Sequence, residues 1–481
     1  MTIKYIRHPN KKYRNNPFIE AMGYPLTVEQ FNQKVSKPFE SDIDLSNTPA
    51  ELHGYYARTE MDNLVDVYVV KDEAYRLYDK IRRMIEAGYR YRNPAGPSIR
   101  RLLGEIDDSK YDQLNSLNIS ELNALRSQLC TFICGLSGIG KTKMIRTILG
   151  LIDQVHDHGS YVDSEGEVHL IGQKQITHLY VEIHERQSQR DVLKNVLAEL
   201  DLYTDEKDKE DYTDYNRNEL ITLIRKIMTL HGVGLLIVDE AQNIEKPSTS
   251  DTLTASTEKP TMKFIEDIFN RIGVPLCFLG THSMLKVFGD EATIARRVAV
   301  NGGLILGSCD VNKPFWIKLI KAMCQTQLLA NQKTSLETLT HHIHVKSAGI
   351  PAIATSLISV TLCYLTFLPA KDQDLSIEAI NFIFDEQFQI LKRVTNAIKT
   401  GKYHLFSDLE YLAILEEVGD KERNPESAAK SVIEKHDNRV LTGELKIKET
   451  TDADEREAQI EEVCDEIKPA NVMSTLGYDV S

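Results

Sequence analysis

Short apolar runs alternate with amphipathic stretches between residues 129 and 307, and this alternation predicts an α/β domain. Each run is long enough for one buried strand, and we expect strands at 129–134, 176–183, 234–238, 274–280 and 302–307. The amphipathic stretches have helical spacing at 143–149, 189–203 and 218–230, and a further helix is expected to end at Asn270. Strands that alternate with helices in this way form a parallel sheet flanked by helices.

The chain after residue 312 has helical periodicity with few strand signals. Helices are expected at 313–329, 335–346, 350–365 and 377–399. Polar stretches at 204–214 and 247–260 are expected to be loops. The pattern divides the chain into an N-terminal extension at 1–110, an α/β core at 111–312, a helical lid at 313–401 and a C-terminal segment at 402–481.

The first predicted strand and helix enclose the sequence GLSGIGKT. This is the phosphate-binding pattern GxxxxGK[ST], in which glycines permit the positive φ angles that turn backbone N–H groups toward phosphate oxygens. The N-terminus of the following helix adds its dipole. The sequence therefore predicts an ATP phosphate site formed by Gly135, Ser137, Gly138, Ile139, Gly140, Lys141, Thr142 and Lys143.

A second motif ends the apolar run at 234–238, which is followed by Asp239 and Glu240. Such a strand is a Walker B element when it accompanies a phosphate loop. We expect Asp239 and the Thr142 hydroxyl to hold Mg²⁺. Lys141 is expected to neutralise phosphate charge during catalysis, and Glu240 to orient or deprotonate the attacking water. Alone, the two acids could merely end a strand at the surface, but the upstream phosphate loop favours the ATPase interpretation.

These motifs resemble those of AAA+ phosphate-loop ATPases, and the resemblance implies further catalytic residues. Thr281 ends the next apolar run at the sensor-1 position, where a hydroxyl helps to hold the γ-phosphate and water. Arg296 or Arg297, at a predicted helix end, is expected to act in trans on ATP bound by the next protomer. The alternatives are an ordinary strand-ending threonine and arginines that cap a helix or pair with an acid. The turn at 347–353 carries no sensor-2 arginine, so no such residue is expected to couple nucleotide to the lid.

Length and composition indicate a globular protein with two or three units. The chain has 481 residues, of which 42% are hydrophobic and 27% charged. No apolar run approaches the roughly 20 residues that span a membrane, and the first residues lack the apolar stretch of a signal peptide. We therefore expect a cytoplasmic protein with no membrane partner. The seven cysteines and the group His341, His342 and His344 lack the spacing or partners of a metal site and are expected to be core or surface residues.

Charge is unevenly distributed along the chain. The net charge of −14 argues against a protein that coats nucleic acid over its whole surface. Basic side chains nevertheless cluster in residues 1–19 and 76–101, where they could meet phosphates. Residues 444–466 are rich in Asp and Glu with little apolar content, and this tail is expected to be mobile and to bind partners. Each cluster could instead be a solvated face.

Several segments together resemble TnsC, the AAA+ transposition regulator of the Tn-seven-type cut-and-paste transposons. The resemblance runs from about Arg14 to Arg297. The Walker motifs are generic to AAA+ proteins, and the two N-terminal runs make the match specific. Departures are His282, where the family pattern has proline, and the region after about residue 402. The matching segments are RNNPFIEA from Arg14, GYRYRNP from Gly88, CGLSGIGKT from Cys134, GVGLLIVDEAQ from Gly232 and IGVPLCFLGT from Ile272.

This resemblance implies an ATP-loaded homo-oligomer, a ring or spiral around duplex DNA, that links a target-selection protein to transposase subunits. The N-terminal part would face the target selector and the C-terminal part the transposase, and hydrolysis would disassemble or proofread the assembly. Positive side chains on the inner wall would contact the DNA backbone rather than the bases. Arg190 and Lys194 are the expected candidates.

Two other functions are compatible with the motifs. A DNA-repair or replication loader of the AAA+ type would share every Walker and sensor residue, and the N-terminal match argues against it. A nucleotide-regulated scaffold or defence signalling protein would use ATP binding without turnover. The presence of both Glu240 and Thr281 favours slow hydrolysis instead.

Overall fold

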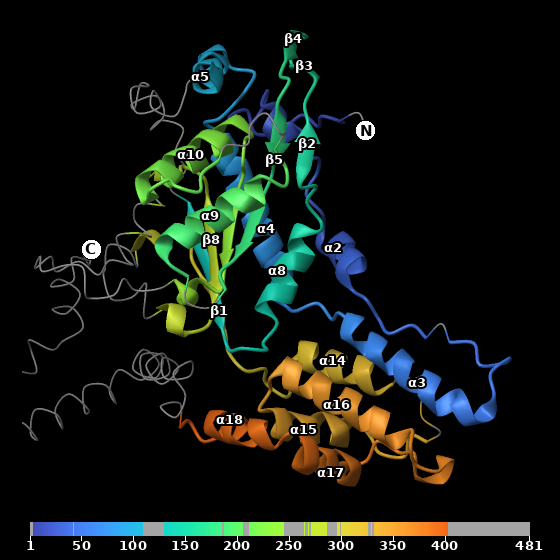
Figure 1. Cartoon of the computed structure of the whole chain (residues 1–481). Coiled ribbons are helices and arrows are strands. Elements are labelled where there is room, and N and C mark those ends of the chain that lie inside the picture. The colour runs from blue at the N-terminus through green and yellow to red at the C-terminus, as the bar shows by residue number, and fades with distance from the viewer. Residues whose placement is uncertain are drawn as a thin grey trace, which may run out of the picture. The chain divides into compact units, whose positions relative to one another are not determined.

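The computed structural model describes most of the chain up to residue 402 (Figure 1). All described residues belong to one compact unit. The loop expected at 247–260, most of the helix expected before Asn270 and the acidic tail lie outside the described residues. These residues are 3–41, 43–108, 129–184, 187–204, 211–244, 271–285, 296–298, 300–325 and 331–402, with Phe264, Ile268 and Leu329.

A parallel sheet of five strands forms the centre of the described unit, in the order β6-β7-β8-β1-β9. Strand β8 lies between β1 and β7, with Leu276 in register with both Cys130 and Leu236. Because parallel strands end at one edge of a sheet, the residues that follow β1, β7 and β8 meet there. The predicted α/β fold is confirmed. The strands are β1 (Cys130–Gly135), β6 (Leu179–Glu182), β7 (Leu236–Asp239), β8 (Leu276–Gly280) and β9 (Leu304–Leu306).

Helices pack on the sheet where amphipathic stretches predict them. Helix α9 contacts β6 and α10, and helix α8 contacts β1 and β8. Side-chain caps fix where two of these helices begin, because Ser188 accepts a hydrogen bond from the Asp191 N–H and Asn216 forms a capping box with Glu219. The helices are α8 (Lys141–Leu149), α9 (Gln189–Leu200) and α10 (Arg217–Leu230).

Five described helices follow β9 in the region where the sequence predicts a helical lid, and this group is called the lid below. Their core surrounds Trp316, whose indole N–H donates to the Thr340 carbonyl oxygen at 3.3 Å. The single helix predicted at 377–399 is broken at Phe388, whose ring stacks on Phe384 in the lid core. The helices are α14 (Pro314–Cys324), α15 (Leu336–Ser347), α16 (Pro351–Leu365), α17 (Ile377–Gln387) and α18 (Gln389–Lys399), with a 3-10 turn at Ala370–Asp372.

The lid histidines have local structural contacts. His342 Nε2 lies 2.9 Å from the Asn381 side-chain oxygen, and His344 Nε2 lies 2.7 Å from the Cys309 carbonyl oxygen. Within the described ranges these histidines belong to no metal-like group. The same ranges hold no single helix that is long and apolar enough to cross a membrane, and α15 and α16 pass that test only as a pair bent by 117°.

The chain between α8 and β6 forms a ribbon made of two short antiparallel strand pairs, and the apolar pattern does not predict this ribbon. Its strands pair antiparallel, β2 with β5 and β3 with β4. The strand predicted at 176–183 is therefore divided, because Ile176 ends β5 and β6 begins at Leu179. Between them the Thr177 hydroxyl donates to the Asp153 carbonyl oxygen at 2.7 Å, where the chain passes from ribbon to sheet. The ribbon strands are β2 (Val155–Asp157), β3 (Ser160–Val162), β4 (Val168–Leu170) and β5 (Lys174–Ile176).

The N-terminal extension packs against both the α/β core and the lid. Helix α4 contacts α8, α5 contacts α10, and α3 contacts α16 of the lid. The extension is therefore part of the same compact unit as the sheet. Its elements are α1 (Pro17–Glu20), α2 (Val28–Val35), α3 (His53–Asp62), α4 (Ala74–Tyr89) and α5 (Pro97–Asp108), with 3-10 turns at Ala50–Leu52 and Asn63–Asp66.

The two N-terminal runs RNNPFIEA and GYRYRNP pack against each other. Asn16 caps α1 by accepting the Phe18 N–H at 3.1 Å, and its amide donates to the Tyr89 carbonyl oxygen at 2.8 Å. The Phe18 and Tyr89 rings lie 5.3 Å apart. Arg92 then donates to the carbonyl oxygen of Val233, just before the Walker B strand, at 2.7 Å. The two runs therefore attach the N-terminal extension to the sheet.

Candidate nucleotide-binding site

The phosphate loop lies between the end of β1 and the start of α8. Strand β1 ends at Gly135, and α8 begins at Lys141. Between them Gly138 and Gly140 have φ angles of +76° and +95°, a region that side-chain-bearing residues rarely adopt. A Cβ on Gly135 would lie 2.6 Å from the Leu306 carbonyl oxygen of β9. Gly138 and Gly140 therefore have the positive φ that the sequence predicts, whereas Gly135 does not, and its lack of a side chain instead allows the close approach of β9.

Three other predicted loop residues differ in their surroundings. Ser137 is exposed at the loop, whereas Ile139 is fully buried. Lys143 is exposed on the first turn of α8, and its ammonium donates to the Val65 carbonyl oxygen of the N-terminal extension at 2.7 Å. Contact of these residues with phosphate stays a prediction.

Lys141 is a buried cation beside the loop. Its ammonium donates to the carbonyl oxygens of Gly135 at 2.9 Å and Leu136 at 3.1 Å. Burial lowers the pKa of Lys141, and the nearby carboxylates of Glu240 and Asp239 act in the opposite direction. A cation held between a glycine loop and two acids is well placed to neutralise phosphate charge.

Asp239 and Thr142 join the two motifs. The Thr142 hydroxyl donates to Asp239 Oδ2 at 2.8 Å, and the Tyr180 hydroxyl donates to the same oxygen. The other oxygen, Oδ1, accepts the Glu240 N–H at 2.8 Å. Asp239 is completely buried, which favours a cation beside its charge. Hydroxyl and carboxylate oxygens are ligands that Mg²⁺ prefers, so this pair fits the predicted metal.

Tyr180 and Arg146 complete the surroundings of Asp239, and no sequence motif marks either residue. The Arg146 guanidinium lies over the Tyr180 ring, 4.9 Å from its centroid, and pairs with Glu182 at 2.9 Å. Burial raises the pKa of Tyr180, and its bond to Asp239 acts in the same direction. Tyr180 therefore stays a proton donor to the Walker B carboxylate at neutral pH.

Glu240 has an uncommon backbone conformation for a residue with a side chain. Its φ of 55° and ψ of 39° are left-handed, so its surroundings hold it there. A 3-10 turn, Ala241–Asn243, follows directly, and the Gln242 amide donates to the Glu240 carboxylate. The carboxylate lies close enough to Lys141 to affect the pKa of that lysine. This position suits the predicted role of Glu240 beside the phosphates.

Thr281 follows β8 and therefore lies at the sheet edge between the two Walker strands. Its hydroxyl is 2.6 Å from the Ser283 hydroxyl, and its N–H donates to the Gln242 side-chain oxygen at 3.1 Å. The next residue, His282, is completely buried, and neither ring nitrogen has a hydrogen-bond partner in the described structure. Burial, reinforced by Lys141, lowers the pKa of His282 to about 4, so the ring is neutral.

The predicted trans-acting arginines lie in a short helical turn at 296–298. Arg296 is exposed and Arg297 is half-buried. Action on a neighbouring subunit stays a prediction for both.

Arg190 and Lys194, the predicted DNA contacts, lie one turn apart on α9. Both donate to the Thr213 carbonyl oxygen at 2.8 Å, and Arg190 also donates to the Tyr215 carbonyl oxygen at 2.9 Å. These bonds hold the loop that precedes α10. The two cations thus have a structural use within the chain, and their contact with DNA stays a prediction.

The lid contacts the phosphate loop at the start of its helix α16. Helix α16 starts at Pro351, and the N–H of Ala352 donates to the Gly138 carbonyl oxygen at 3.1 Å. A Cβ on Gly138 would lie only 3.0 Å from the Ala352 Cβ. The missing sensor-2 arginine therefore does not separate the lid from the loop, because backbone contact joins them.

A cavity of about 550 Å³ lies beside the loop, between the N-terminal extension and the lid. Lys71 lies in its wall, donates to the Ile139 carbonyl oxygen at 2.5 Å and lies 5.0 Å from the centroid of the Phe315 ring. Burial lowers the pKa of Lys71. The sequence does not single out Lys71, because it lies 68 positions before the loop it contacts. The apolar lining includes Leu64, Val67, Ile139, Phe315, Leu319 and Pro351.

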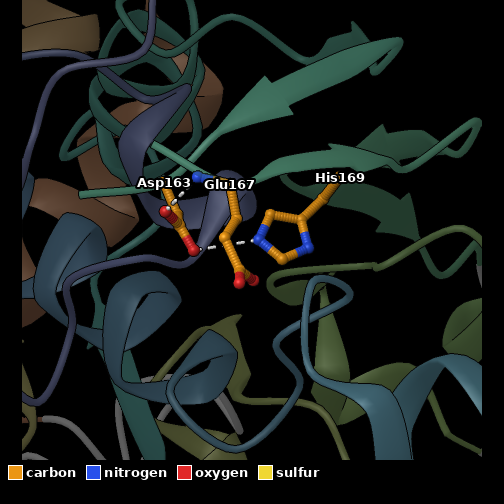
Figure 2. Close-up of side chains that lie close together, drawn as sticks. All are labelled: Asp163, Glu167 and His169. Atoms are coloured by element: carbon orange, nitrogen blue, oxygen red, sulfur yellow. Dashed lines mark hydrogen bonds and ion pairs between the residues drawn. The ribbon is translucent and has the colours of Figure 1, made fainter. Parts of the chain in front are cut away.

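Figure 2 shows the group of metal-ligand residue types in the described chain, Asp163, Glu167 and His169. Asp163 Oδ1 accepts the N–H groups of Glu165 at 2.8 Å and Glu167 at 3.0 Å, and Oδ2 lies 3.0 Å from His169 Nε2. The other ring nitrogen of His169 lies 3.3 Å from the Arg100 guanidinium. Asp163 closes the turn between β3 and β4, and both ring nitrogens of His169, in β4, are engaged, so hairpin closure explains this group.

Known proteins provide an independent comparison for this site. Residues 124–288 match the model of an AAA domain family. No curated protein matches the sequence. Similar solved structures include a Walker-type ATPase of Pyrococcus abyssi (10% identity, 66% of this chain and 76% of that chain, TM-score 0.32) and the ORC2 protein of Aeropyrum pernix (11% identity, 59% and 67%, TM-score 0.34). Another is domain III of the replication initiation protein DnaA of Thermotoga maritima (12% identity, 61% and 94%, TM-score 0.30).

The family match contains the phosphate loop, the Walker B pair and Thr281. P-loop NTPases bind nucleotide, typically with Mg²⁺, which agrees with the donor set formed by Thr142 and Asp239. The region that carries the site, residues 124–288, is therefore an AAA domain of the P-loop NTPase class.

Proposed function

We propose that this chain hydrolyses ATP at the carboxyl edge of its sheet, and that its ATP-bound form assembles on duplex DNA to link a target-selection protein to a transposase. One observation carries the hydrolysis part: the Thr142 hydroxyl donates to Asp239 Oδ2 at 2.8 Å. The contact joins the phosphate loop to the Walker B carboxylate, as a site for one magnesium ion and one triphosphate requires. The assembly part rests on the resemblance of the N-terminal runs to TnsC.

The positions of the site residues support a division of roles. The loop N–H groups and the Lys141 ammonium would bind phosphate oxygens, and Thr142 with Asp239 would hold the metal. When bound, Mg²⁺ would supply positive charge that neutralises the phosphate oxygens. Glu240 would accept the proton of the attacking water, and Thr281 would hold the water and a γ-phosphate oxygen.

The nucleotide base is proposed to bind in the cavity beside the loop. Its volume of about 550 Å³ is in the range of ligand pockets, and its walls include the apolar side chains of Val67, Phe315 and Pro351. An adenine ring is planar with apolar faces, so such walls suit it. The N-terminal extension, the loop and the lid would then all contact one nucleotide.

Nucleotide binding by Lys141→Ala tests this assignment. We expect titration with a fluorescent ATP analogue to show at least about tenfold weaker binding, because the buried cation between loop and acids is lost. Lys321→Ala is the matched control, since Lys321 is exposed on α14 and should not affect binding. Equal affinity of Lys141→Ala and wild type would contradict the site.

Assembly on DNA is proposed to require ATP and to involve several copies of the chain. In a homo-oligomer, Arg296 or Arg297 of one subunit would stabilise charge on the ATP of the next. Arg190 and Lys194 are proposed to contact the DNA backbone. The proposed location is the cytoplasm, with no membrane partner.

Filter binding to duplex DNA tests the assembly proposal. Binding should need ATP, disappear in Lys141→Ala, weaken steeply with added salt and show little sequence preference, because cations on phosphates act by releasing counterions. Affinity that is flat between low and moderate salt, or that depends on one short sequence, would contradict contact with the backbone.

A truncation after residue 440 tests the proposed transposase contact. The removed segment is rich in acids, so ATP hydrolysis and DNA assembly should persist while transposase recruitment is lost. Loss of hydrolysis and assembly, or retention of recruitment, would refute the assignment of this contact to the tail.

A further inference from the structure

The side chain of Gln242 bridges the Walker B glutamate and the end of the neighbouring strand. Its oxygen accepts the Thr281 backbone N–H at 3.1 Å, and its nitrogen donates to the Glu240 carboxylate. Gln242 belongs to the 3-10 turn after β7, whereas Thr281 follows β8. One amide therefore connects two adjacent strand ends of the site.

The backbone donor determines which way this amide points. An N–H group can meet only an acceptor, so the Gln242 oxygen must face Thr281 and its NH₂ group must face Glu240. Glu240 accepts with Oε2, which leaves its other oxygen for a water molecule. Hydrogen bonds to an ionised carboxylate are stronger than neutral ones, so the Gln242 amide orients the carboxylate of Glu240.

Gly280 provides the space that this amide needs. A Cβ at position 280 would overlap the Gln242 oxygen and lie 3.1 Å from Met284 Sδ. Gly280 is not among the glycines with positive φ in the described chain, so its backbone does not require glycine. The absence of a side chain at Gly280 leaves the space that the Gln242 amide occupies.

Separate contacts hold the backbone of Glu240. Asp239 Oδ1 accepts its N–H at 2.8 Å, and its carbonyl oxygen accepts the Asn243 N–H at 2.9 Å. These bonds fix the left-handed backbone at Glu240, while the Gln242 amide acts on the carboxylate itself. The backbone position of Glu240 and the orientation of its carboxylate are thus fixed by different hydrogen bonds.

We propose that Gln242 is a positioning residue, which couples the position of the Thr281 backbone to the orientation of the Glu240 carboxylate. This inference rests on the proposed ATP hydrolysis and deepens it. A shift of the β8 end with the bound phosphates would move the Gln242 amide and re-aim the carboxylate. Loss of Gln242 should slow the chemical step without weakening nucleotide binding, because its bonds go to Glu240 and Thr281 rather than to the phosphate loop.

Three variants separate this role from a merely structural one. Gln242→Met keeps the length of the side chain and removes both bonds. Gln242→Glu keeps an acceptor for Thr281 but replaces the donor to Glu240 with a carboxylate. Gly280→Ala displaces the amide without changing it. All three should lower kcat for ATP by between about tenfold and a hundredfold, with KM within about twofold of wild type.

The matched control is Gln173→Met, in the ribbon just before β5. The Gln173 amide donates to the Leu230 carbonyl oxygen at 3.2 Å, and this variant should hydrolyse ATP at the wild-type rate. A wild-type kcat in Gln242→Glu would show that Gln242 only supports the turn at Thr281, and would overturn the proposal. Loss of binding of a fluorescent ATP analogue in folded Gln242→Met would overturn it as well.

A double-mutant cycle tests the connection through Glu240 directly. In the Glu240→Gln background, adding Gln242→Met should change the residual rate by less than about twofold, because the residue it orients is already lost. If Glu240→Gln is slow but Gln242→Met alone is normal, this inference fails and the proposed hydrolysis site stands. If Glu240→Gln itself has the wild-type rate, the catalytic assignment fails first.

Discussion

The backbone N–H of Ala352 donates to the carbonyl oxygen of Gly138 at 3.1 Å, so the first turn of lid helix α16 rests on the phosphate loop. A loop that changes shape around phosphates must therefore move the lid or break this bond. The contact uses main-chain atoms, which no sequence motif reports. It provides a direct physical connection between the phosphate loop and the lid.

Ala352→Leu should weaken ATP binding by about tenfold, because the larger side chain enters the cavity beside the loop. The free energy of unfolding should hardly change, since Ala352 is exposed. Titration with a fluorescent ATP analogue and urea unfolding measure the two effects. Val345→Leu, on the exposed side of α15, is the control. Unchanged affinity in Ala352→Leu would contradict the assignment of this cavity to the nucleotide.

Lys71→Met should lower the free energy of unfolding by about 1–3 kcal/mol, because the buried Ile139 carbonyl oxygen loses its donor. ATP affinity should also fall, since that carbonyl belongs to the phosphate loop. Lys34→Met, on the exposed face of α2, provides the comparison. If both variants unfold like wild type in urea, Lys71 does not support the loop.

Asn16→Ala should destabilise the protein by about 1–3 kcal/mol, because it removes the cap of α1 and a buried bond to the Tyr89 carbonyl oxygen. Asn10→Ala also removes a local bond, to the Lys12 N–H, but at an exposed site. Chemical denaturation of the two variants should differ accordingly. Equal stability would show that the run RNNPFIEA does not anchor the extension.

Stability should fall as the pH drops from about 6.5 to 4. Burial lowers the pKa of His158 from 6.5 to about 4, and its ring nitrogens contact the Tyr5 hydroxyl and the Gln175 amide oxygen. The unfolded chain therefore takes up a proton near pH 6.5, whereas the native chain does so only near pH 4. His178 and His282 have lowered pKa values from the same cause.

Urea unfolding of wild type and His158→Gln at about pH 7.5 and pH 5 measures the contribution of this ring. The variant should lose less stability between the two conditions, because it has no proton to take up at this position. Equal losses would show that His158 does not control the acid response.

Sequence patterns predict the alternating strands and helices of the α/β core. The apolar runs give the five strands of the sheet, and the phosphate loop has the positive φ values expected at Gly138 and Gly140. Thr142 and Asp239, 97 positions apart, are joined by a hydrogen bond, because Thr142 lies in the first turn of the helix after β1, Asp239 ends β7, and both strands end at one edge of the sheet. Their joint binding of Mg²⁺ stays a prediction. These features depend on local patterns and on a shared topology.

The remaining site residues could not be predicted, because their roles arise from contacts between distant segments. Lys71 and Ala352 reach the loop from the N-terminal extension and the lid, and Tyr180 reaches Asp239 from a neighbouring strand. None of these residues has a characteristic spacing from the motif it supports. The apolar pattern does not predict the ribbon at 155–176, because its short strands carry no apolar run.

Single-turnover ATP hydrolysis by wild type and Glu240→Gln, with Mg²⁺ and duplex DNA, tests the central claim most directly. Glu240→Gln keeps the size of the side chain and loses the base, so it should bind ATP as wild type does and release phosphate at least about a hundredfold more slowly. Omitting Mg²⁺ should abolish turnover by wild type. Phosphate release by Glu240→Gln at the wild-type rate would contradict the account of this site.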